Sequence, residues 1–249
     1  MLPAMLRSFG TLVLALGLLC ALLAPQPSVA QTPEGAQALA RAMEAGRDRD
    51  WLTANRAAAR AGPGTVGLAV GLVEWHRLRV GGDTASFAEY RAFTERYPDW
   101  PGMPYLRRQG EGSIPVGGAP DAVIAWFGPH APVTSHGALR LIEAFRAKEQ
   151  VGDAQALAVQ VWRALSLQAS EQAQLLDLYP RLLADHHIAR LDAMLWQGDG
   201  DAARAMFDLV PEGWRKLAQA RLGLRAQAAG VDDLIAAVPA ALQTDPGLA

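Results

Sequence analysis

Residues 152–165 read GDAQALAVQVWRAL, and this stretch decides the class of fold. Its apolar residues recur at i, i+3, i+4 and i+7, which is the spacing of one face of an α-helix. The residues on that face are Ala154, Leu157, Ala158, Val161 and Leu165. The stretch therefore predicts an amphipathic helix with one buried side.

A second stretch, residues 200–209, reads GDAARAMFDL and follows the same spacing with Ala202, Ala205, Met206 and Leu209. Both stretches open with Gly-Asp-Ala. We expect the glycine to end one helix in a left-handed conformation and the aspartate to cap the next helix. Short helices joined by such turns must be antiparallel neighbours, and a single pair cannot bury its apolar stripe alone. The sequence predicts an all-α fold, an α-superhelix of stacked antiparallel helical hairpins.

The rest of the chain carries further helix signals. Thr32-Pro33 is a typical helix start, Gly46 should close that helix, and Asp50 should cap a helix over Trp51 to Ala61. Residues 62–64, Gly-Pro-Gly, mark a break. Gly67 and Gly71 lie inside a helical pattern, which costs about 1 kcal/mol each relative to alanine.

Two features limit this pattern. Pro180 should kink or split a helix over Leu175 to Leu183, because proline lacks the N–H that the helix interior needs. The helix pattern has no fixed 34-residue period, so a regular tetratricopeptide array is not supported. Residues 114–116, Ile-Pro-Val, are the nearest approach to a strand, and proline interrupts them.

Composition excludes some classes of function. The chain has 249 residues, 51% hydrophobic and 19% charged, which suits one globular domain or two small ones. The formal net charge is −2, so the totals do not suggest a nucleic-acid partner.

The first 30 residues are typical of a cleavable signal peptide. Arg7 supplies the positive charge, residues 12–23 are continuously apolar, and Ser28-Val29-Ala30 offers small residues for cleavage between Ala30 and Gln31. Twelve residues at about 1.5 Å each cannot cross a bilayer core of roughly 30 Å, so we expect no stable membrane anchor. The prediction is export to the periplasm, with a domain over residues 31–249 that contains no cysteine.

Candidate catalytic and metal-binding residues are sparse. His186 and His187 are adjacent, so on a helix their side chains diverge by about 100° and would not share a metal. His130 and His136 flank a proline-containing loop, and Ser135-His136 more plausibly begins a helix than forms a nucleophile and base. We predict no metal site and no catalytic residue.

The acidic residues have structural explanations. Two pairs, Asp48 with Asp50 and Asp232 with Asp233, sit at predicted helix starts, where carboxylates favour the positive end of the helix dipole. Glu111 follows Arg107 at i+4 and is expected to form a surface pair. The sequence contains no phosphate-binding glycine loop and no zinc-protease or serine-hydrolase motif, so no cofactor is expected.

Seven tryptophans are spread along the chain: Trp51, Trp75, Trp100, Trp126, Trp162, Trp196 and Trp214. Indole faces stack on sugars, but most of these residues are expected to be large anchors between packed helices. Trp100 lies between Pro98 and Pro101 in a stiff loop. It is the candidate for an exposed, substrate-binding tryptophan.

Several segments resemble the N-terminal superhelical domain of the soluble lytic murein transglycosylases of bacterial periplasms. They are Tyr97-Pro98-Asp99-Trp100-Pro101-Gly102 with Leu106-Arg107-Arg108, Ala125-Trp126-Phe127 with Pro132-Val133-Thr134 and Gly137, Ala189-Arg190-Leu191-Asp192 with Leu195-Trp196 and Gly198, and Val238-Pro239 with Asp245-Pro246-Gly247-Leu248. The matches are spread over Trp51 to Leu248 in the family's order.

The resemblance implies a partner and a reaction. In this family a ring of helical hairpins precedes a lysozyme-like domain whose catalytic glutamate lies in a Glu-Ser pair, followed by Gly-Leu-Met-Gln. Neither motif occurs in this sequence, so no catalytic residue carries over. The chain would be a non-catalytic scaffold that positions or encloses peptidoglycan glycan strands for cleavage to anhydro-muramyl ends. The alternative is a free-standing periplasmic helical-repeat scaffold that binds another protein.

Overall fold

The structure is a computed structural model that describes residues 33–82 and 85–249. The predicted signal peptide, residues 1–30, and the cleavage bond between Ala30 and Gln31 lie outside the described residues. Within the described ranges every regular element is a helix and none is a strand, as the sequence predicts. The α-helices are α2 (Pro33–Arg47), α3 (Trp51–Ala58), α4 (Val66–Val80), α5 (Phe87–Arg96), α6 (Met103–Gly112), α7 (Pro120–Phe127), α8 (Ser135–Ala147), α9 (Val151–Ala164), α10 (Ala169–Leu178), α11 (Pro180–Ala184), α12 (His187–Gln197), α13 (Gly200–Arg204), α14 (Glu212–Arg225) and α15 (Val231–Ala236); two short 3-10 helices follow, η2 (Ala240–Leu242) and η3 (Pro246–Leu248).

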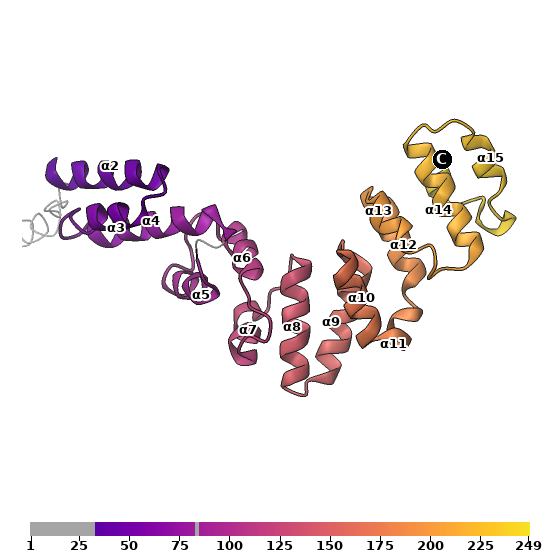
Figure 1. The fold of residues 1–249 in the computed structure, drawn as a ribbon, viewed down its shortest axis with the longest axis horizontal. Helices are drawn as coiled ribbons and strands as arrows, with labels where there is room; N and C mark the ends of the chain where they lie inside the picture. Colours follow the sequence, from indigo (N-terminus) through magenta and orange to yellow (C-terminus); the bar gives the residue numbers. More distant parts are fainter. Residues whose placement is uncertain (1–32, 83–84) are drawn as a thin grey trace, which may run out of the picture. The chain divides into compact units, whose positions relative to one another are not determined.

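The chain divides into two compact units, one up to Arg77 and one from Leu78 onward. In the first unit, α2 packs against α3 (Figure 1). Its buried core is built almost entirely from alanines: Ala42, Ala45, Ala54, Ala58, Ala61, Ala69 and Val73. Small side chains let the helix backbones approach closely.

The helix boundaries in the first unit follow the predicted signals closely. Asp50 caps α3, since its carboxylate accepts a hydrogen bond from Thr53 N at 3.0 Å. The first helix ends at Arg47, one residue after Gly46. The second ends at Ala58, three residues before the predicted Ala61. α4 continues through both Gly67 and Gly71.

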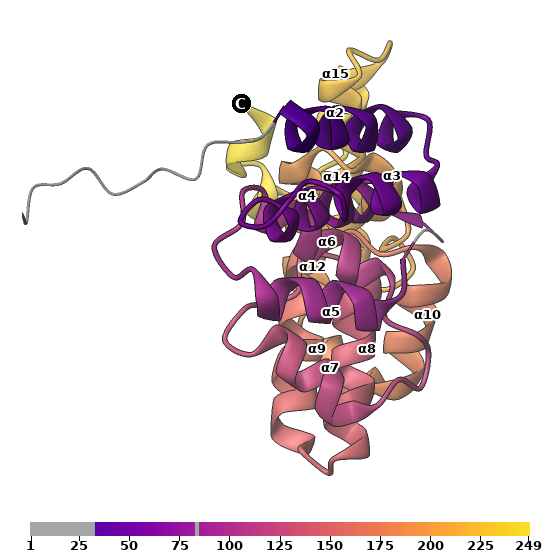
Figure 2. The same cartoon turned by 90° about the vertical axis from the view of Figure 1, so that its left-hand side faces the viewer.

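In the second unit, helices pack on neighbours that are near in sequence. Helices α8 and α9 are joined by a short turn and lie side by side in opposite directions (Figures 1 and 2). The predicted face of α9 is buried at Ala154, Leu157, Ala158 and Val161. Pro180 splits its helix as expected, because α10 ends at Leu178 and α11 begins at the proline.

The two Gly-Asp turns are displaced from their predicted positions. α9 begins at Val151, after left-handed Glu149 (φ 59°), so Gly152 and Asp153 already belong to the helix. Before α13 the left-handed residue is Gly198 (φ 81°) instead of Gly200. Asp199 is the cap, accepting from Ala202 N at 3.0 Å. Asp199 lies three residues before Ala202, whose backbone N–H has no partner inside the helix. Asp199 therefore provides the cap, and α13 starts directly after it.

A regular offset links two segments of the second unit. Three hydrogen bonds join residues 33 positions apart: Ser166 Oγ to Asp199 Oδ2 at 2.6 Å, Gln172 Nε2 to the Ala205 carbonyl at 3.3 Å, and Gln197 Nε2 to the Ala164 carbonyl at 3.0 Å. The region of α9 and α10 therefore contacts the region of α12 and α13 at corresponding places.

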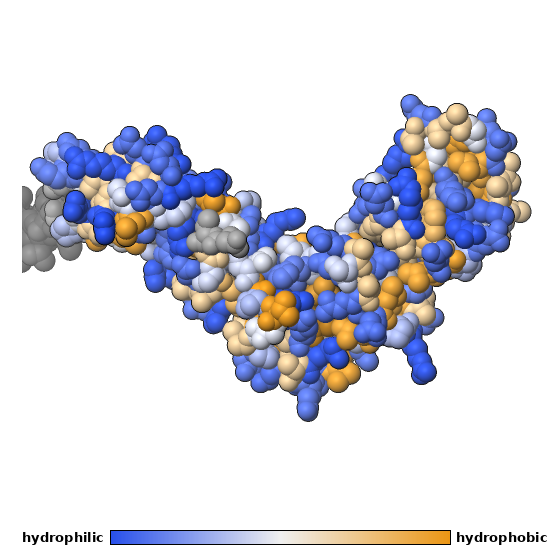
Figure 3. Space-filling model, viewed as in Figure 1, coloured by the Kyte–Doolittle hydropathy of each residue, from blue (hydrophilic) through white to orange (hydrophobic). Residues whose placement is uncertain are grey.

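Large apolar side chains that remain exposed are scattered along both units. They are Leu52, Leu68, Tyr105, Val116, Val133, Val151 and Trp196. On the face shown in Figure 3, hydrophobic residues appear between hydrophilic ones. Single exposed apolar residues are normal on a protein surface. Trp196 is the exposed aromatic side chain among them that borders a pocket, and Val133 borders another one.

Candidate functional site

The seven tryptophans lie in different environments. Trp126 and Trp162 are buried, at 6% and 0% exposure, as expected for helix anchors. Trp51, Trp75, Trp100 and Trp214 are half-buried. Trp196 is 55% exposed. It is therefore the tryptophan whose indole is most available to a ligand among those that the structure describes.

Trp100, the predicted candidate, is partly covered by neighbouring aromatic rings. Its ring centroid lies 4.7 Å from that of Tyr97 and 5.6 Å from that of Phe93, both at steep interplanar angles. Phe93 is fully buried in α5. These edge-to-face contacts hold Trp100 against α5.

Helical geometry explains the exposure of Trp196. The buried residues of α12 are Arg190, Leu191, Met194 and Leu195. At about 100° per residue, position 196 falls roughly 170° from the centre of that buried face. The side chain therefore lies off the buried face of α12, beside Arg221 of α14.

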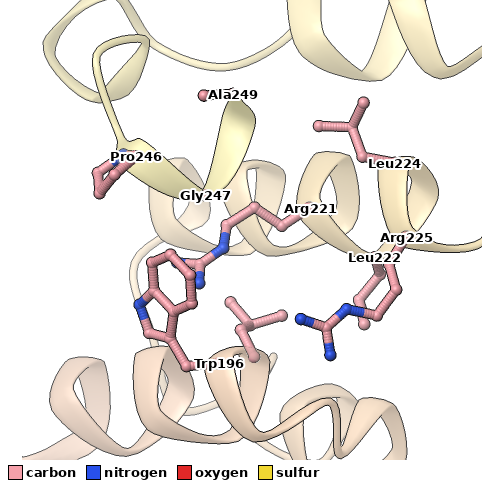
Figure 4. Close-up of a pocket in the computed structure, with 9 residues that line it drawn as sticks. Trp196, Arg221, Leu222, Leu224, Arg225, Pro246, Gly247 and Ala249 are labelled. Atoms are coloured by element: carbon pink, nitrogen blue, oxygen red, sulfur yellow. The ribbon is translucent and has the colours of Figure 1, made fainter.

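Beside Trp196 the structure has a pocket of about 380 Å³, shown in Figure 4. It lies between α12, α14 and η3 and is lined by Leu195, Trp196, Arg221, Leu222, Leu224, Arg225, Pro246, Gly247 and Ala249. Figure 4 shows the Trp196 indole and the Arg225 guanidinium on opposite sides of the pocket. The lining thus combines an indole, two guanidinium groups and several aliphatic side chains.

Arg221 is a fixed part of this site. It is buried, and its guanidinium carbon lies 4.7 Å from the centroid of the Trp196 ring. Its Nη1 donates to Asp192 at 2.6 Å and pairs with Asp245 at 3.4 Å. A side chain at Gly247 would overlap the Arg221 guanidinium, so the glycine permits this close approach.

Arg225 is on the last turn of α14 and is exposed. Its Nη1 lies over Gly198, the left-handed residue that ends α12, where any side chain would collide with it. Among the described residues it forms no ion pair and no side-chain hydrogen bond. Arg225 is therefore a cation on the pocket wall with its donors available.

The histidines have structural surroundings. His187 lies 5.4 Å from the Trp162 ring, and burial lowers its pKa, with further lowering from His186 and Arg190. His136 Nε2 is 2.8 Å from the Ile114 carbonyl, and His130 is exposed. Ser135 begins α8, as expected. Residues 33–82 and 85–249 contain no group of three or more His, Cys, Asp or Glu side chains arranged to hold a metal.

The structure corrects the surface pair predicted for Glu111 and Arg107. It is only 3% exposed, and its carboxylate accepts hydrogen bonds from Val133 N at 3.1 Å, Thr134 N at 2.8 Å and Thr134 Oγ1 at 2.6 Å. Arg107 donates instead to the Trp126 carbonyl at 3.1 Å. The reason is that the backbone N–H groups entering α8 need a nearby acceptor, and Glu111 supplies one.

The paired aspartates also have structural surroundings. Asp50 caps α3, and Asp232 and Asp233 occupy the first turn of α15. Asp48 lies in the turn after α2, where its backbone N–H donates to the Glu44 carbonyl at 3.3 Å.

No helix in the described ranges combines the length and apolarity needed to cross a membrane.

The residues of the Trp196 pocket come from three segments of the second unit. Trp196 was included among the seven tryptophans but was not singled out, and Arg221 and Arg225 were not predicted. Comparisons with protein-family models, with curated proteins and with solved structures found no match to this chain.

Proposed function

We propose that this chain is the non-catalytic superhelical scaffold of a periplasmic lytic transglycosylase. It would position or enclose peptidoglycan glycan strands for a lysozyme-like catalytic domain that these 249 residues do not contain. The observation that carries the proposal is Trp196, an exposed indole on the wall of a pocket.

The chemistry of the pocket fits a sugar ligand. The C–H groups of a pyranose face pack favourably on an indole, and the polar edge of the ring needs hydrogen-bond donors. Arg221 and Arg225 supply donors at the pocket of about 380 Å³, which is within the range of small-ligand sites. Arg221 also fixes the indole from one side.

The packing of the helices supports a stacked arrangement of hairpins. Hydrogen bonds at a constant offset of 33 residues are expected when successive hairpins stack on one another. Such stacks form extended concave surfaces, which suit a polymeric ligand.

Binding to isolated sacculi tests the proposal. Purified residues 31–249 should co-sediment with sacculi at low salt, and Trp196→Ala should weaken binding about 10-fold, the loss of roughly 1.4 kcal/mol of contact. Val116→Ala, which shortens another exposed apolar side chain, is the matched control and should bind like the wild type. Failure of the wild type to co-sediment would favour the protein-binding scaffold instead.

Catalysis is expected to lie in another domain. The purified protein should release no anhydro-muropeptides from sacculi, measured by chromatography of the soluble products. Turnover at a rate comparable to a transglycosylase would contradict the proposal.

Residues 1–30 should export a fused reporter enzyme that is active only outside the cytoplasm.

A further inference from the structure

We propose that the Trp196 pocket and a groove on the other side of α12 are two consecutive subsites for one linear polysaccharide, which crosses α12 and places a repeating unit in each. This inference rests on the proposed function and names the form of its ligand, an extended glycan instead of a single sugar. It follows from the way in which α9, α12 and α14 lie beside one another.

The second subsite is an open groove of about 600 Å³ between α9 and α12. This α9–α12 groove is lined by Ala156, Val159, Gln160, Arg163, Ala164, Ala189, Asp192 and Ala193. Gln160, Arg163 and Asp192 supply its polar groups, and the other lining residues are small and aliphatic. The lining holds one arginine and one aspartate, so its side chains favour neither sign of charge.

The lining of the groove follows the offset of 33 residues found elsewhere in the second unit. Ala164 and Gln197, which are 33 positions apart, are hydrogen-bonded at 3.0 Å. A constant difference in residue number means that two helices lie side by side in the same direction. Three pairs of lining residues on α9 and α12 have this difference: Ala156 and Ala189, Val159 and Asp192, and Gln160 and Ala193.

Helices α12 and α14 lie side by side in the same order. Asp192 is hydrogen-bonded to Arg221 at 2.6 Å, and further along both helices Gly198 lies beside Arg225. The Trp196 pocket is bordered by these two helices and η3. The groove and the pocket therefore lie on either side of α12, between successive members of the row α9, α12 and α14.

One face of α12 joins the two hollows. Ala189, Asp192, Ala193 and Trp196 recur at i, i+3, i+4 and i+7, the spacing of a single helix face. The first three line the groove, and Trp196 lines the pocket. Asp192 of the groove also holds Arg221 of the pocket. A ligand that extends from one hollow to the other therefore passes over the exposed indole.

The spacing of the hollows fits a polysaccharide. Packed neighbouring helices lie roughly 8–10 Å apart, which is about the length of one disaccharide. A strand with a disaccharide repeat would present the same groups to both hollows. Once one unit is bound, the next binds at a high effective concentration, so filling both hollows raises the affinity.

The experiment is isothermal titration calorimetry of purified residues 31–249 with neutral chito-oligosaccharides of increasing length. We expect the tetrasaccharide to bind about 10-fold tighter than the disaccharide, because it reaches both hollows. The hexasaccharide should bind like the tetrasaccharide. Trp196→Ala should weaken the binding of all three ligands.

Filling the groove should remove the effect of length. Ala156→Leu combined with Ala193→Leu places two larger side chains in the α9–α12 groove. The tetrasaccharide should then bind as weakly as the disaccharide, whose own affinity is unchanged. Ala88→Leu combined with Ala184→Leu is the matched control, because both alanines are exposed and neither lines the groove or the pocket. Circular dichroism checks that each variant is folded.

Arg163→Ala provides a second test that leaves the packing of α9 intact, since Arg163 is exposed and lines the groove. It should weaken binding of the tetrasaccharide and leave that of the disaccharide unchanged.

The negative results are distinguishable. Equal affinity for the disaccharide and the tetrasaccharide, or an effect of length that survives both groove variants, would overturn the two-subsite inference alone. Wild-type protein that binds no saccharide and no sacculi would overturn the proposed function as well.

Discussion

Contacts between an arginine and a tryptophan recur in the second unit. The guanidinium carbons of Arg107, Arg190 and Arg221 lie 5.4, 4.6 and 4.7 Å from the ring centroids of Trp126, Trp162 and Trp196, respectively. In the first two pairs the arginine also donates to carbonyls at the end of the helix that carries the tryptophan. Arg221 donates to carboxylates instead, and its tryptophan is the exposed one.

Arg190 shows how such a contact stabilises the fold. It is fully buried, and its Nη1 donates to the Trp162 carbonyl at 2.6 Å and the Leu165 carbonyl at 2.9 Å. Burial lowers its pKa to about 10, partly offset by Asp199, so the guanidinium stays protonated at neutral pH. The charge therefore caps the end of α9 permanently.

Arg190→Ala should lower the free energy of unfolding by about 2–4 kcal/mol, because two charged hydrogen bonds and the packing on Trp162 are lost. Arg163→Ala, an exposed change on α9, should alter it by less than about 0.5 kcal/mol. Urea denaturation followed by circular dichroism measures both. Equal effects of the two variants would contradict the capping role.

The environment of His187 predicts that the stability of the protein depends on pH. Burial lowers its pKa below the ordinary value of 6.5. The unfolded chain therefore binds a proton at a higher pH than the folded one. The stability contributed by the neutral ring is complete above pH 6.5 and is lost as the pH falls through the lowered pKa.

His187→Phe should reduce this loss, since phenylalanine keeps a ring against Trp162 and does not titrate. The free energy of unfolding of wild type and variant is measured by urea denaturation from pH 7.5 to 5. The slopes of this free energy against pH are then compared. The Nδ1 atom is buried without a hydrogen-bond partner in the described structure, so the variant should also remain folded. Identical slopes would exclude a role for His187.

At the scale of the element, Glu111 and Gly137 form the entry to α8. The Glu111 carboxylate accepts from Thr134, and a side-chain carbon on Gly137 would lie 2.6 Å from Glu111 Oε2. The absence of a side chain at Gly137 allows the buried carboxylate to reach the start of the helix.

Gly137→Ala should therefore destabilise the protein, by about 1–3 kcal/mol, through overpacking. Gly152→Ala is the matched comparison, because Gly152 is also in the first turn of a helix but has open space around it. Alanine there should stabilise the protein by about 0.5–1 kcal/mol. Thermal or urea unfolding measures both; a stabilising Gly137→Ala would show that Glu111 can move away.

The helices were largely predictable from sequence because their signals are local. The spacing of α9, the cap at Asp50 and the break at Pro180 all depend on neighbouring residues. The turns before α9 and α13 were misplaced because several residues there can take the left-handed or capping position. Glu111 was misread because its partners, Val133 and Thr134, follow it by 22 and 23 residues.

The candidate site was only partly predictable. A helical wheel of residues 187–197 would have placed Trp196 opposite the buried face, so its exposure could have been found from sequence. The place of Arg221 in the site could not have been found from the sequence, because its partner Asp192 lies 29 residues away on another helix. The offset of 33 residues is likewise a property of packing that the helix pattern of the sequence does not show.

At the scale of the whole molecule, the two units have different cores. In the first unit the buried cluster is six alanines and one valine. The second buries larger side chains, including Trp162, Tyr90, Phe93 and Met194. A buried methyl group contributes about 0.8 kcal/mol, whereas a large apolar side chain contributes about 1.5–3 kcal/mol. The first unit should therefore open more readily.

Hydrogen–deuterium exchange read by mass spectrometry tests this difference. Amides of α2 and α3 should exchange faster than those of α8 and α9 at the same pH, because local opening of the first unit costs less free energy. An Ala54→Val variant would not be a useful control, because valine would overfill the closely packed core. The exchange rates of the wild-type protein therefore decide whether the first unit opens more readily. Equal protection in both pairs of helices would contradict the prediction.

The constant offset between α9–α10 and α12–α13 also has a consequence for how the chain folds. Each of the three hydrogen bonds closes a loop of the same modest length, so no step requires the meeting of distant ends. Helices that pack on elements near in sequence form faster than structure that depends on contacts between the ends of the chain, and they can form before the whole chain is available. A growing chain would thus complete α9 and α10 first, and α12 and α13 would then pack against them.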